Sequence, residues 1–183
     1  MTRAGEEIGS CEMAQIREER EGDESGIRAV NLAAFRQAVE ADIVDKLCTG
    51  CDKMLSLVAV METQIVGHIL FSPVTIESGT GVVEGMGLGP MAVLPEHQRR
   101  GIGSELVREG LGLLRQRACP FVVVLGHPEY YPRFGFERAS RRGIRCQWEG
   151  VPDEAFMIFV MDEAGMKGVS GVARYQAEFE EAV

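Results

Sequence analysis

Residues 91–106, MAVLPEHQRRGIGSEL, are the most informative stretch of the chain: an apolar run, a turn rich in arginine and glycine, and the start of a helix. The first N–H groups of a helix have no partner inside it and carry the positive end of the helix dipole. Gly101 and Gly103 remove side chains that would keep a ligand away from this backbone, and Arg99 and Arg100 add charge at its rim. The stretch is typical of a site for a compact anion such as a pyrophosphate.

Two better-known phosphate motifs do not fit this turn. A P-loop needs a lysine directly after its second glycine, and residues 98–106 contain no lysine. A dinucleotide fingerprint needs a third glycine, but Leu106 stands three residues after Gly103. Taken alone, the turn is therefore either an anion site or a plain glycine-rich start of a helix.

The chain on either side of this turn alternates between strand-like and helix-like hydrophobic patterns. Residues 102–114 place apolar side chains at helical spacing, whereas 54–60 and 121–125 are short apolar runs rich in β-branched residues. Hairpins and crossovers are both needed to connect them, which predicts an α/β fold with a mixed sheet and helices on its faces. The expected strands are 11–17, 54–60, 65–76, 85–94, 121–125, 144–148 and 155–161, and the expected helices are 23–37, 41–48, 101–117 and 130–134.

Length and composition indicate one globular domain. The chain has 183 residues, of which 45% are hydrophobic and 26% are charged. We expect residues 1–10 to form a flexible tail and residues 11–183 to form a single domain. No apolar run approaches the roughly 20 residues needed to cross a bilayer, and the N-terminus does not read as a secretory signal. These features predict a protein of the cytoplasm without a membrane partner.

The charge of the chain is strongly uneven. A net charge of −9 and a pI near 4.9 argue against a nucleic-acid partner. Residues 98–145 nevertheless contain ten arginines, no lysine and four acidic residues, a net charge of +6. Such an island suits a compact anion, although a solvated arginine-rich helix face would give the same count.

The cysteines do not indicate a metal site or a disulfide framework. Their odd number, five, and the missing signal favour reduced thiols. Cys48 and Cys51 have the spacing of a redox or zinc pair, but no second pair accompanies them, and the three histidines are far apart in the sequence. We expect no metal, and the role of Cys48 and Cys51 stays open.

The quoted motif resembles that of the GNAT family of acetyl-CoA-dependent N-acetyltransferases. The family signature [RQ]-x-x-G-x-[GA] reads QRRGIG at 98–103, and the strand tripeptide before it reads MAV at 91–93. A later family pattern, F-Y-x-x-x-G-F, is matched by YYPRFGF at 130–136. Together with VLGHP at 124–128, that match resembles a bacterial subgroup described as YhbS-like acetyltransferases. The resemblance covers about residues 12–183.

The resemblance implies a GNAT fold with acetyl-CoA as cosubstrate and no metal. In this fold the sheet splays between its fourth and fifth strands, here the strands ending at Val93 and Leu125. The backbone of Met91 and Val93 would hydrogen-bond the pantetheine arm, and the amides of residues 99–104 would hold the pyrophosphate. The implied cofactor-binding set is Met91, Ala92, Val93, Gln98, Arg99, Arg100, Gly101, Ile102, Gly103 and Ser104.

Tyr131 falls at the position that often protonates the departing CoA thiolate in this family. A thiolate, of pKa about 8.5, leaves more easily when a phenol donates a proton to it. The alternative for Tyr131 is an aromatic ring packed beneath the splay, and we expect its neighbour Tyr130 in the core.

No general base is evident. Some relatives use a glutamate on the strand before the CoA loop, at a position that aligns near Gly87, and that glutamate is missing here. Glu84 lies three residues earlier, where strand alternation points it to the opposite face unless a bulge intervenes. His127, at the end of a strand, and water are the other candidates.

The resemblance therefore predicts an enzyme that transfers an acetyl group from acetyl-CoA directly to a primary amine of a small molecule or a protein. The alternative is a non-catalytic acyl-CoA-binding module or sensor of the same fold. A transferase for a longer acyl group is an intermediate possibility, because Gly85, Gly87 and Gly89 would leave room for one unless they mark a bulge.

The acceptor itself is not identified by the sequence. In related folds the acceptor pocket is built by the loop between the first two helices and by the last strands, here about 37–42 and 143–153. Glu40 and Trp148 could line such a pocket. The acidic composition fits a cationic amine, and dimers are common in this family, which leaves a homodimer open.

Overall fold

The computed structural model describes residues 14–35, 53–79 and 81–177. Its elements are β1 (Gln15–Glu18), α1 (Glu24–Phe35), β2 (Leu55–Met61), β3 (Gln64–Ser78), β4 (Gly81–Val93), the 3₁₀ turn η1 (Pro95–His97), α3 (Ile102–Gln116), β5 (Phe121–Leu125), η2 (Tyr131–Phe134), β6 (Glu137–Arg138), η3 (Ala139–Arg142), β7 (Ile144–Cys146), β8 (Phe156–Val160) and β9 (Gly171–Arg174). The predicted helix 41–48, together with Glu40, Cys48 and Cys51, lies outside the described residues.

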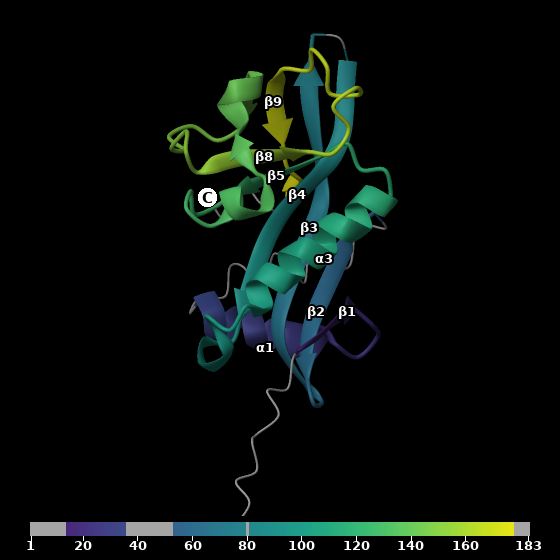
Figure 1. Ribbon diagram of the computed structural model, residues 1–183, viewed down its shortest axis with the longest axis vertical. Helices are drawn as coiled ribbons and strands as arrows, with labels where there is room; N and C mark the ends of the chain where they lie inside the picture. The colour runs from purple at the N-terminus through teal and green to yellow at the C-terminus, as the bar shows by residue number, and fades with distance from the viewer. Residues whose placement is uncertain (1–13, 36–52, 80, 178–183) are drawn as a thin grey trace, which may run out of the picture.

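The strands form a mixed sheet, as the sequence predicts. The order along the sheet is β1-β2-β3-β4-β5-β8-β6, and β9 joins it by pairing with β3 and β7 (Figure 1). Neighbours run antiparallel except for β4 beside β5 and β7 beside β9. The long strands β3 and β4 connect the lower part of the molecule, where α1 lies, to the upper part, which holds the chain from β5 to β9.

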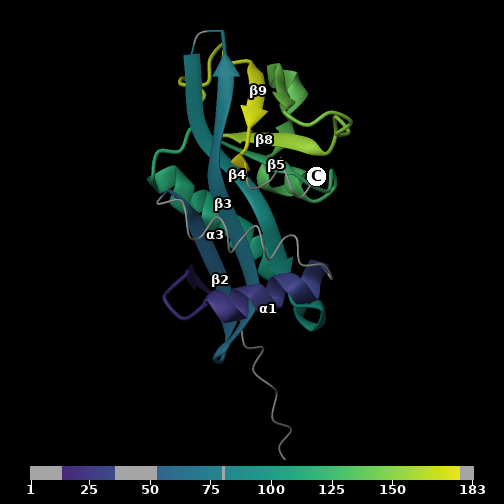
Figure 2. The same ribbon diagram turned by 180° about the vertical axis from the view of Figure 1, so that it is seen from behind.

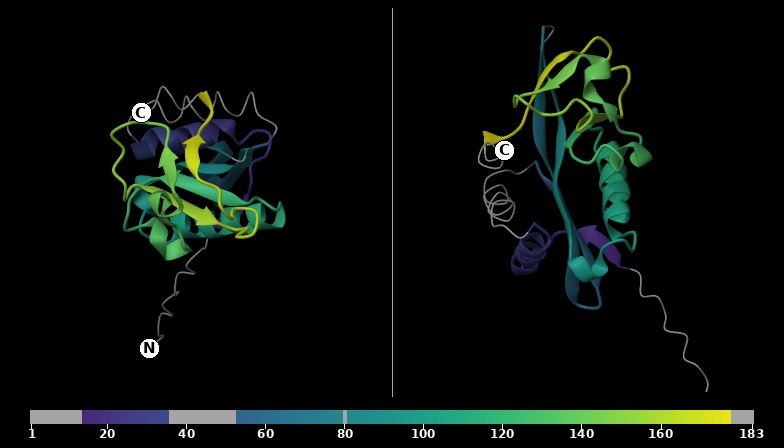
Figure 3. Two further views of the ribbon diagram at one scale, coloured as in Figure 1. Left: turned by 90° about the horizontal axis from the view of Figure 1, so that it is seen from above. Right: turned by 90° about the vertical axis from the view of Figure 1, so that its left-hand side faces the viewer.

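The two described α-helices cover opposite faces of the sheet, as Figure 2 and the right-hand view of Figure 3 show. Ile27 of α1 packs on Val58 and Leu70. On the other face α3 approaches β3 closely, because Gly110 leaves the space that the ring of Phe71 occupies. This packing fixes where the N-terminus of α3 lies relative to the end of β4.

The sheet splays between β4 and β5, which confirms the expected architecture. Parallel pairing is confined to residues 86–88 of β4 and 122–124 of β5. Beyond Leu88, β4 continues to Val93 with β3 as its partner, while β5 ends at Leu125. At the point of separation two residues of β4, Gly89 and Pro90, face the single residue Leu70 of β3, and this bulge turns the strand away from β5.

Several short elements differ from the expectation. The first strand is Gln15–Glu18 rather than 11–17, and β9 is a strand that the sequence pattern does not predict. It is only four residues long, and it is held by pairing with residues 75–77 of β3. Gly171 begins it with φ +150°, and a side chain there would collide with the carbonyl of Glu77, so only glycine fits this start.

A wholly buried histidine links α1 to the centre of the sheet. The Nδ1 of His68 lies 3.1 Å from the amide nitrogen of Asn31, and its Nε2 lies 3.0 Å from the hydroxyl of Ser56. The same Asn31 nitrogen donates to the carbonyl of Ile27 at 2.9 Å. These contacts suit a neutral ring that accepts at Nδ1 and donates at Nε2, and burial lowers the pKa of His68 to about 3.

Candidate active site

The turn between β4 and α3 exposes the N-terminus of the helix. Gly101 caps α3 in the left-handed region with φ +93°, and Arg99 before it also has a positive φ of 61°. The first hydrogen bond of the helix runs from the Glu105 N–H to the Gly101 carbonyl at 3.0 Å. The N–H groups of residues 102–104 come before that bond, so the helix itself offers them no carbonyl acceptor. They provide the donors that an anion needs.

The free edge of β4 turns backbone groups into the splay. The Leu94 N–H donates to the Val66 carbonyl of β3 at 2.9 Å. In an antiparallel pair such contacts alternate, so the backbone groups of Met91 and Val93 point away from β3, whereas those of Ala92 face it. The structure thus directs Met91 and Val93 toward the gap beside β5. A strand-like ligand arm can pair there.

Gln98, the first residue of the signature, is used within the protein. Its side-chain nitrogen donates to the Val93 carbonyl at 3.0 Å. The glutamine therefore ties the loop to the end of β4 and occupies one acceptor site of that carbonyl. Its side chain shapes the loop, a role that the spacing of the motif does not reveal.

Tyr131 lies just beyond the end of β5, inside an aromatic cluster. Its side chain is 7% exposed, and its ring covers Gly126, where any side chain would collide with it. The rings of Tyr130 and Phe136 meet it edge-on with centroids 5.1 and 5.6 Å away. Burial, with a smaller contribution from Tyr130, raises the pKa of Tyr131 well above the ordinary value of 10. The phenol therefore carries its proton at neutral pH and well above it.

Tyr130 corrects the expectation of a plain core residue. Its ring is half-buried between Tyr131 and Phe134, but its hydroxyl reaches the helix N-terminus. That oxygen lies 3.1 Å from the position that a Cβ on Gly103 would take, and Met91 lies 3.7 Å from the same position. The end of β4, the start of α3 and the segment before η2 therefore meet at Gly103.

The position aligned with a catalytic glutamate is filled by a ring. A Cβ on Gly87 would lie 2.6 Å from the Tyr175 side chain and 2.7 Å from that of Val74. Tyr175 stacks on Trp148 with centroids 5.0 Å apart, and its backbone N–H donates to the Gln147 side chain at 2.9 Å. Burial raises the pKa of Tyr175 above its ordinary value. No carboxylate fits at residue 87 while this ring is in place.

The two named candidates for a base lie on the surface. Glu84 is exposed and pairs with Lys53 at 3.2 Å. The pairing of β3 and β4 is regular from residue 81 to residue 88, so no bulge turns Glu84 to the face of Gly87. His127 is exposed beyond the end of β5, one residue after the glycine that Tyr131 covers.

Space for a longer acyl chain is not found at two of the three strand glycines. A Cβ on Gly85 would lie 2.6 Å from the ring of Phe121, and the space over Gly87 belongs to Tyr175. Only Gly89 opens onto free space. The expectation of room at Gly85 and Gly87 is therefore wrong, because aromatic rings from other elements fill it.

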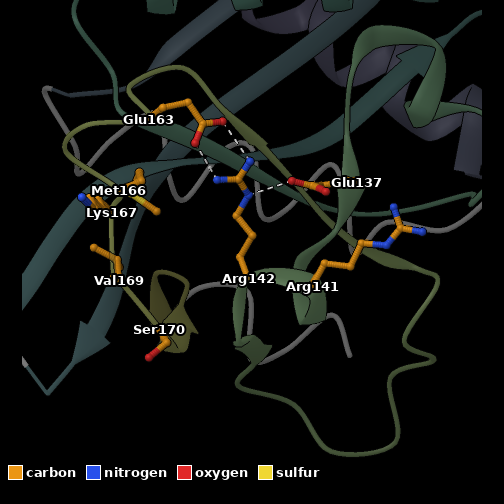
Figure 4. A pocket seen from close by; sticks show the side chains of 9 residues that line it. Glu137, Arg141, Arg142, Glu163, Met166, Lys167, Val169 and Ser170 are labelled. Carbon is orange, nitrogen blue, oxygen red and sulfur yellow. Dashed lines mark hydrogen bonds and ion pairs between the residues drawn. The ribbon is translucent and has the colours of Figure 1, made fainter.

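A cavity of about 660 Å³ lies apart from these groups, between η3 and residues 163–170 (Figure 4). The guanidinium of Arg142 spans it, with two contacts of 2.7 and 2.8 Å to Glu163 and one of 2.7 Å to Glu137. Arg141 points away from this pair. The pairing raises the pKa of Arg142 and lowers that of Glu163. The positive charge of Arg142 is therefore used in ion pairs within the protein.

Two further observations concern metals and membranes. Among residues 14–35, 53–79 and 81–177 no group of three histidine, cysteine or acidic side chains is placed to hold a metal ion. Of the helices described in this structure, none combines the length and apolar character needed to cross a membrane.

Comparison with known proteins places the chain in a family. Residues 15–139 match the family model described as "Acetyltransferase (GNAT) domain". The chain is 34% identical over 158 residues to the uncharacterized N-acetyltransferase YhbS of Escherichia coli K12, covering 86% of this chain and 93% of the relative.

Two solved structures resemble the whole fold. The crystal structure of E. coli YhbS in complex with CoA superposes with a TM-score of 0.84, at 34% identity and 92% coverage of both chains. A GNAT acetyltransferase from Brucella melitensis, in complex with acetyl-CoA, gives a TM-score of 0.74 at 37% identity, covering 92% of this chain and 99% of that one. The chain belongs to the GNAT family of N-acetyltransferases and is an enzyme of that class.

Proposed function

We propose that this enzyme transfers an acetyl group from acetyl-CoA to a primary amine while both substrates are bound. The observation that carries the proposal is the splay between β4 and β5, which has anion donors on one side and a buried phenol at its end. In this arrangement the amides of residues 99–104 hold the pyrophosphate, and the backbone of Met91 and Val93 pairs with the pantetheine arm. The complexes of its relatives with CoA and acetyl-CoA support the choice of cosubstrate.

The proposed reaction uses few groups of the chain. The neutral amine attacks the thioester carbonyl, and the N–H of Val93, which faces the splay, stabilises the oxyanion. As the tetrahedral intermediate collapses, the C–S bond breaks and the Tyr131 hydroxyl gives its proton to the sulfur. The nitrogen gives up its proton to water or to His127, and the Tyr131 phenolate takes a proton back from solvent. The products are the amide and CoA with a free thiol.

Release of a free thiol tests this function directly. The enzyme is incubated with acetyl-CoA and a panel of primary amines, including peptides with a free N-terminus or a lysine. We expect thiol to appear only when both substrates are present, and the acetylated amine to form in equal amount. Thiol release that is independent of every amine, with no acetylated product, would contradict transfer to an amine.

A binding module without chemistry is the second candidate. The ring of Tyr175 over Gly87 favours it, because this ring excludes a carboxylate at residue 87, the position near which the base of some relatives aligns. The position of the Tyr131 phenol at the end of the splay favours the enzyme. Tight binding of acetyl-CoA with no thiol release for any amine would support the module.

We infer that the acceptor approaches beside Tyr175 and Trp148. These stacked rings lie on the face of the sheet opposite α3, next to Gly87 at the start of the splay. An aromatic face suits an amine that arrives as a cation. A Trp148→Ala variant should raise KM for the amine and leave KM for acetyl-CoA unchanged. A raised KM for acetyl-CoA with an unchanged KM for the amine would show that Trp148 contacts the cosubstrate instead.

A substitution at Gly101 tests the pyrophosphate site. Gly101→Val introduces a β-branched residue at φ +93° and should weaken acetyl-CoA binding by at least tenfold, because the strained turn costs roughly 1–3 kcal/mol and disturbs the amides. Gly112→Val on the same helix is the control, since a Cβ there meets open space. Isothermal titration of both variants gives the comparison. Equal affinity in the two variants would remove the loop from the binding site.

A further inference from the structure

Two arginines pack against one aromatic cluster beside the helix N-terminus. The guanidinium of Arg133 lies 4.3 Å from the centre of the Tyr130 ring and 5.4 Å from that of Phe134. Arg108 of α3 approaches the same Phe134 ring at 5.5 Å. The cluster formed by Arg108, Tyr130, Arg133 and Phe134 is called the arginine–aromatic cluster below.

The cluster adjoins the turn at residues 98–103, which leads into α3. The Tyr130 hydroxyl lies 3.1 Å from where a Cβ on Gly103 would stand. A single tyrosine side chain thus separates the Arg133 guanidinium from the first amides of α3. Arg108 follows Gly103 by five residues, a rise of about 7.5 Å along the helix. Through the rings of Tyr130 and Phe134, both cations are connected to the backbone at Gly103.

The arginines of this cluster differ from others of the cationic island. Arg117, Arg138 and Arg142 each pair with a carboxylate. Within the part of the chain that the structure describes, neither Arg108 nor Arg133 pairs with one. Two like charges therefore lie beside the Phe134 ring, an arrangement that favours an anionic ligand.

Arg133 is also fixed in place before any ligand arrives. Its Nε donates to the Tyr130 carbonyl at 3.1 Å, and its plane is held over the Tyr130 ring. Its two terminal nitrogens make no further hydrogen bond among the described residues. A guanidinium held in this way presents two donors in the spacing of phosphate oxygens, with little further loss of side-chain freedom.

We propose that Arg133, assisted by Arg108, binds the 3′-phosphate of CoA and makes the enzyme select CoA over its 3′-dephospho form. This inference rests on the proposed use of acetyl-CoA. The 3′-phosphate is a phosphomonoester dianion on the ribose, a second compact charge a short way from the pyrophosphate. The helix amides hold the pyrophosphate, and the arginine–aromatic cluster holds the second charge. Tyr130 lies between the helix amides and Arg133, and its ring and carbonyl hold the guanidinium in place.

The test compares acetyl-CoA with 3′-dephospho-acetyl-CoA. Dissociation constants are measured for the wild type, Arg133→Met and Arg115→Met. Methionine keeps an apolar stem on the ring and removes the charge. Arg115 is the matched control, because it also lies over a ring, 5.7 Å from the centre of Phe159, but a further seven residues along α3 from Arg108. Melting temperatures confirm that both variants fold.

We expect the wild type and Arg115→Met to bind acetyl-CoA about 10- to 100-fold more tightly than the 3′-dephospho form. In Arg133→Met this ratio should fall to near one, through loss of acetyl-CoA affinity alone. The discrimination should also shrink as salt is raised.

Three outcomes would overturn the inference. A wild type that binds both forms equally has no 3′-phosphate site. An Arg133→Met variant that weakens both forms by the same factor places Arg133 on the pyrophosphate. An Arg133→Met variant that binds both forms as tightly as the wild type removes Arg133 from the site. If the wild type binds neither form, the proposed use of acetyl-CoA fails, and that result is distinct from the other three.

Discussion

We expect Tyr131→Phe to lower kcat by about 10²- to 10³-fold while the affinity for acetyl-CoA stays within about twofold. The hydroxyl is the only group removed. The ring that covers Gly126 and meets Tyr130 and Phe136 is kept, so the fold and the cosubstrate site are preserved. Without the phenol, the thiolate must leave unprotonated. Steady-state thiol release and titration with CoA measure the two quantities.

The pH profile separates proton donation from packing. Burial holds the pKa of Tyr131 above 10, so the wild-type kcat should not fall between pH 8 and pH 10. Because the phenol stays protonated over this range, the deficit of Tyr131→Phe should persist across it. A Tyr131→Phe variant with wild-type kcat at pH 7 would show that the tyrosine only packs beneath the splay.

The second large effect concerns stability in acid. Because His68 is buried and neutral, its pKa is about 3 in the folded protein, against an ordinary value of 6.5 for a histidine in water. Below pH 6.5 the His68 ring binds a proton in the unfolded chain but stays neutral in the folded protein. The free energy of unfolding should therefore fall by about 1.4 kcal/mol per pH unit below this point. Between pH 6.5 and pH 4.5 the loss is roughly 2 to 3 kcal/mol.

His68→Gln tests this assignment. Glutamine can still hydrogen-bond Asn31 and Ser56 but does not titrate, so urea unfolding should lose most of its pH dependence between pH 6.5 and pH 4.5. His127→Gln is the control, because His127 is exposed and should keep the wild-type slope. A wild-type slope in His68→Gln would assign the acid sensitivity to other groups. Below that window carboxylates such as Asp23, whose pKa Arg17 lowers, add their own loss.

The elements with a strong local pattern are predictable from the sequence. Residues 102–116 form a helix because apolar side chains recur on one face, and 121–125 form a strand because a short β-branched run is buried on both sides. β9 was not predictable. Its four residues carry no alternation, and its pairing with β3 brings together positions 97 residues apart, Glu77 and Arg174. Long-range contacts decide such a strand.

The site divides in the same way. The glycine-rich turn and the start of α3 were predictable, because the glycines, the arginines and the helix start are neighbours in the sequence. The contacts of Tyr130 with Gly103 and of Tyr175 with Gly87 were not, because each joins distant segments through side-chain packing. The glycines of β4 were a partial signal. Their missing side chains indicated something large nearby, and the structure identifies it as Phe121 and Tyr175 rather than an acyl chain.

The most direct test of the central claim is the melting temperature with acetyl-CoA, with CoA, and with ADP, which lacks the pantetheine. Ligand at 100 times its dissociation constant adds about 2.7 kcal/mol of stability, which raises the melting temperature of a domain of this size by roughly 5 to 10 °C. We expect that rise with acetyl-CoA and with CoA, and a much smaller rise with ADP at the same concentration. No rise with acetyl-CoA at saturating concentration would contradict the account, because the loop at residues 98–103 would then be a structural turn and not a cosubstrate site.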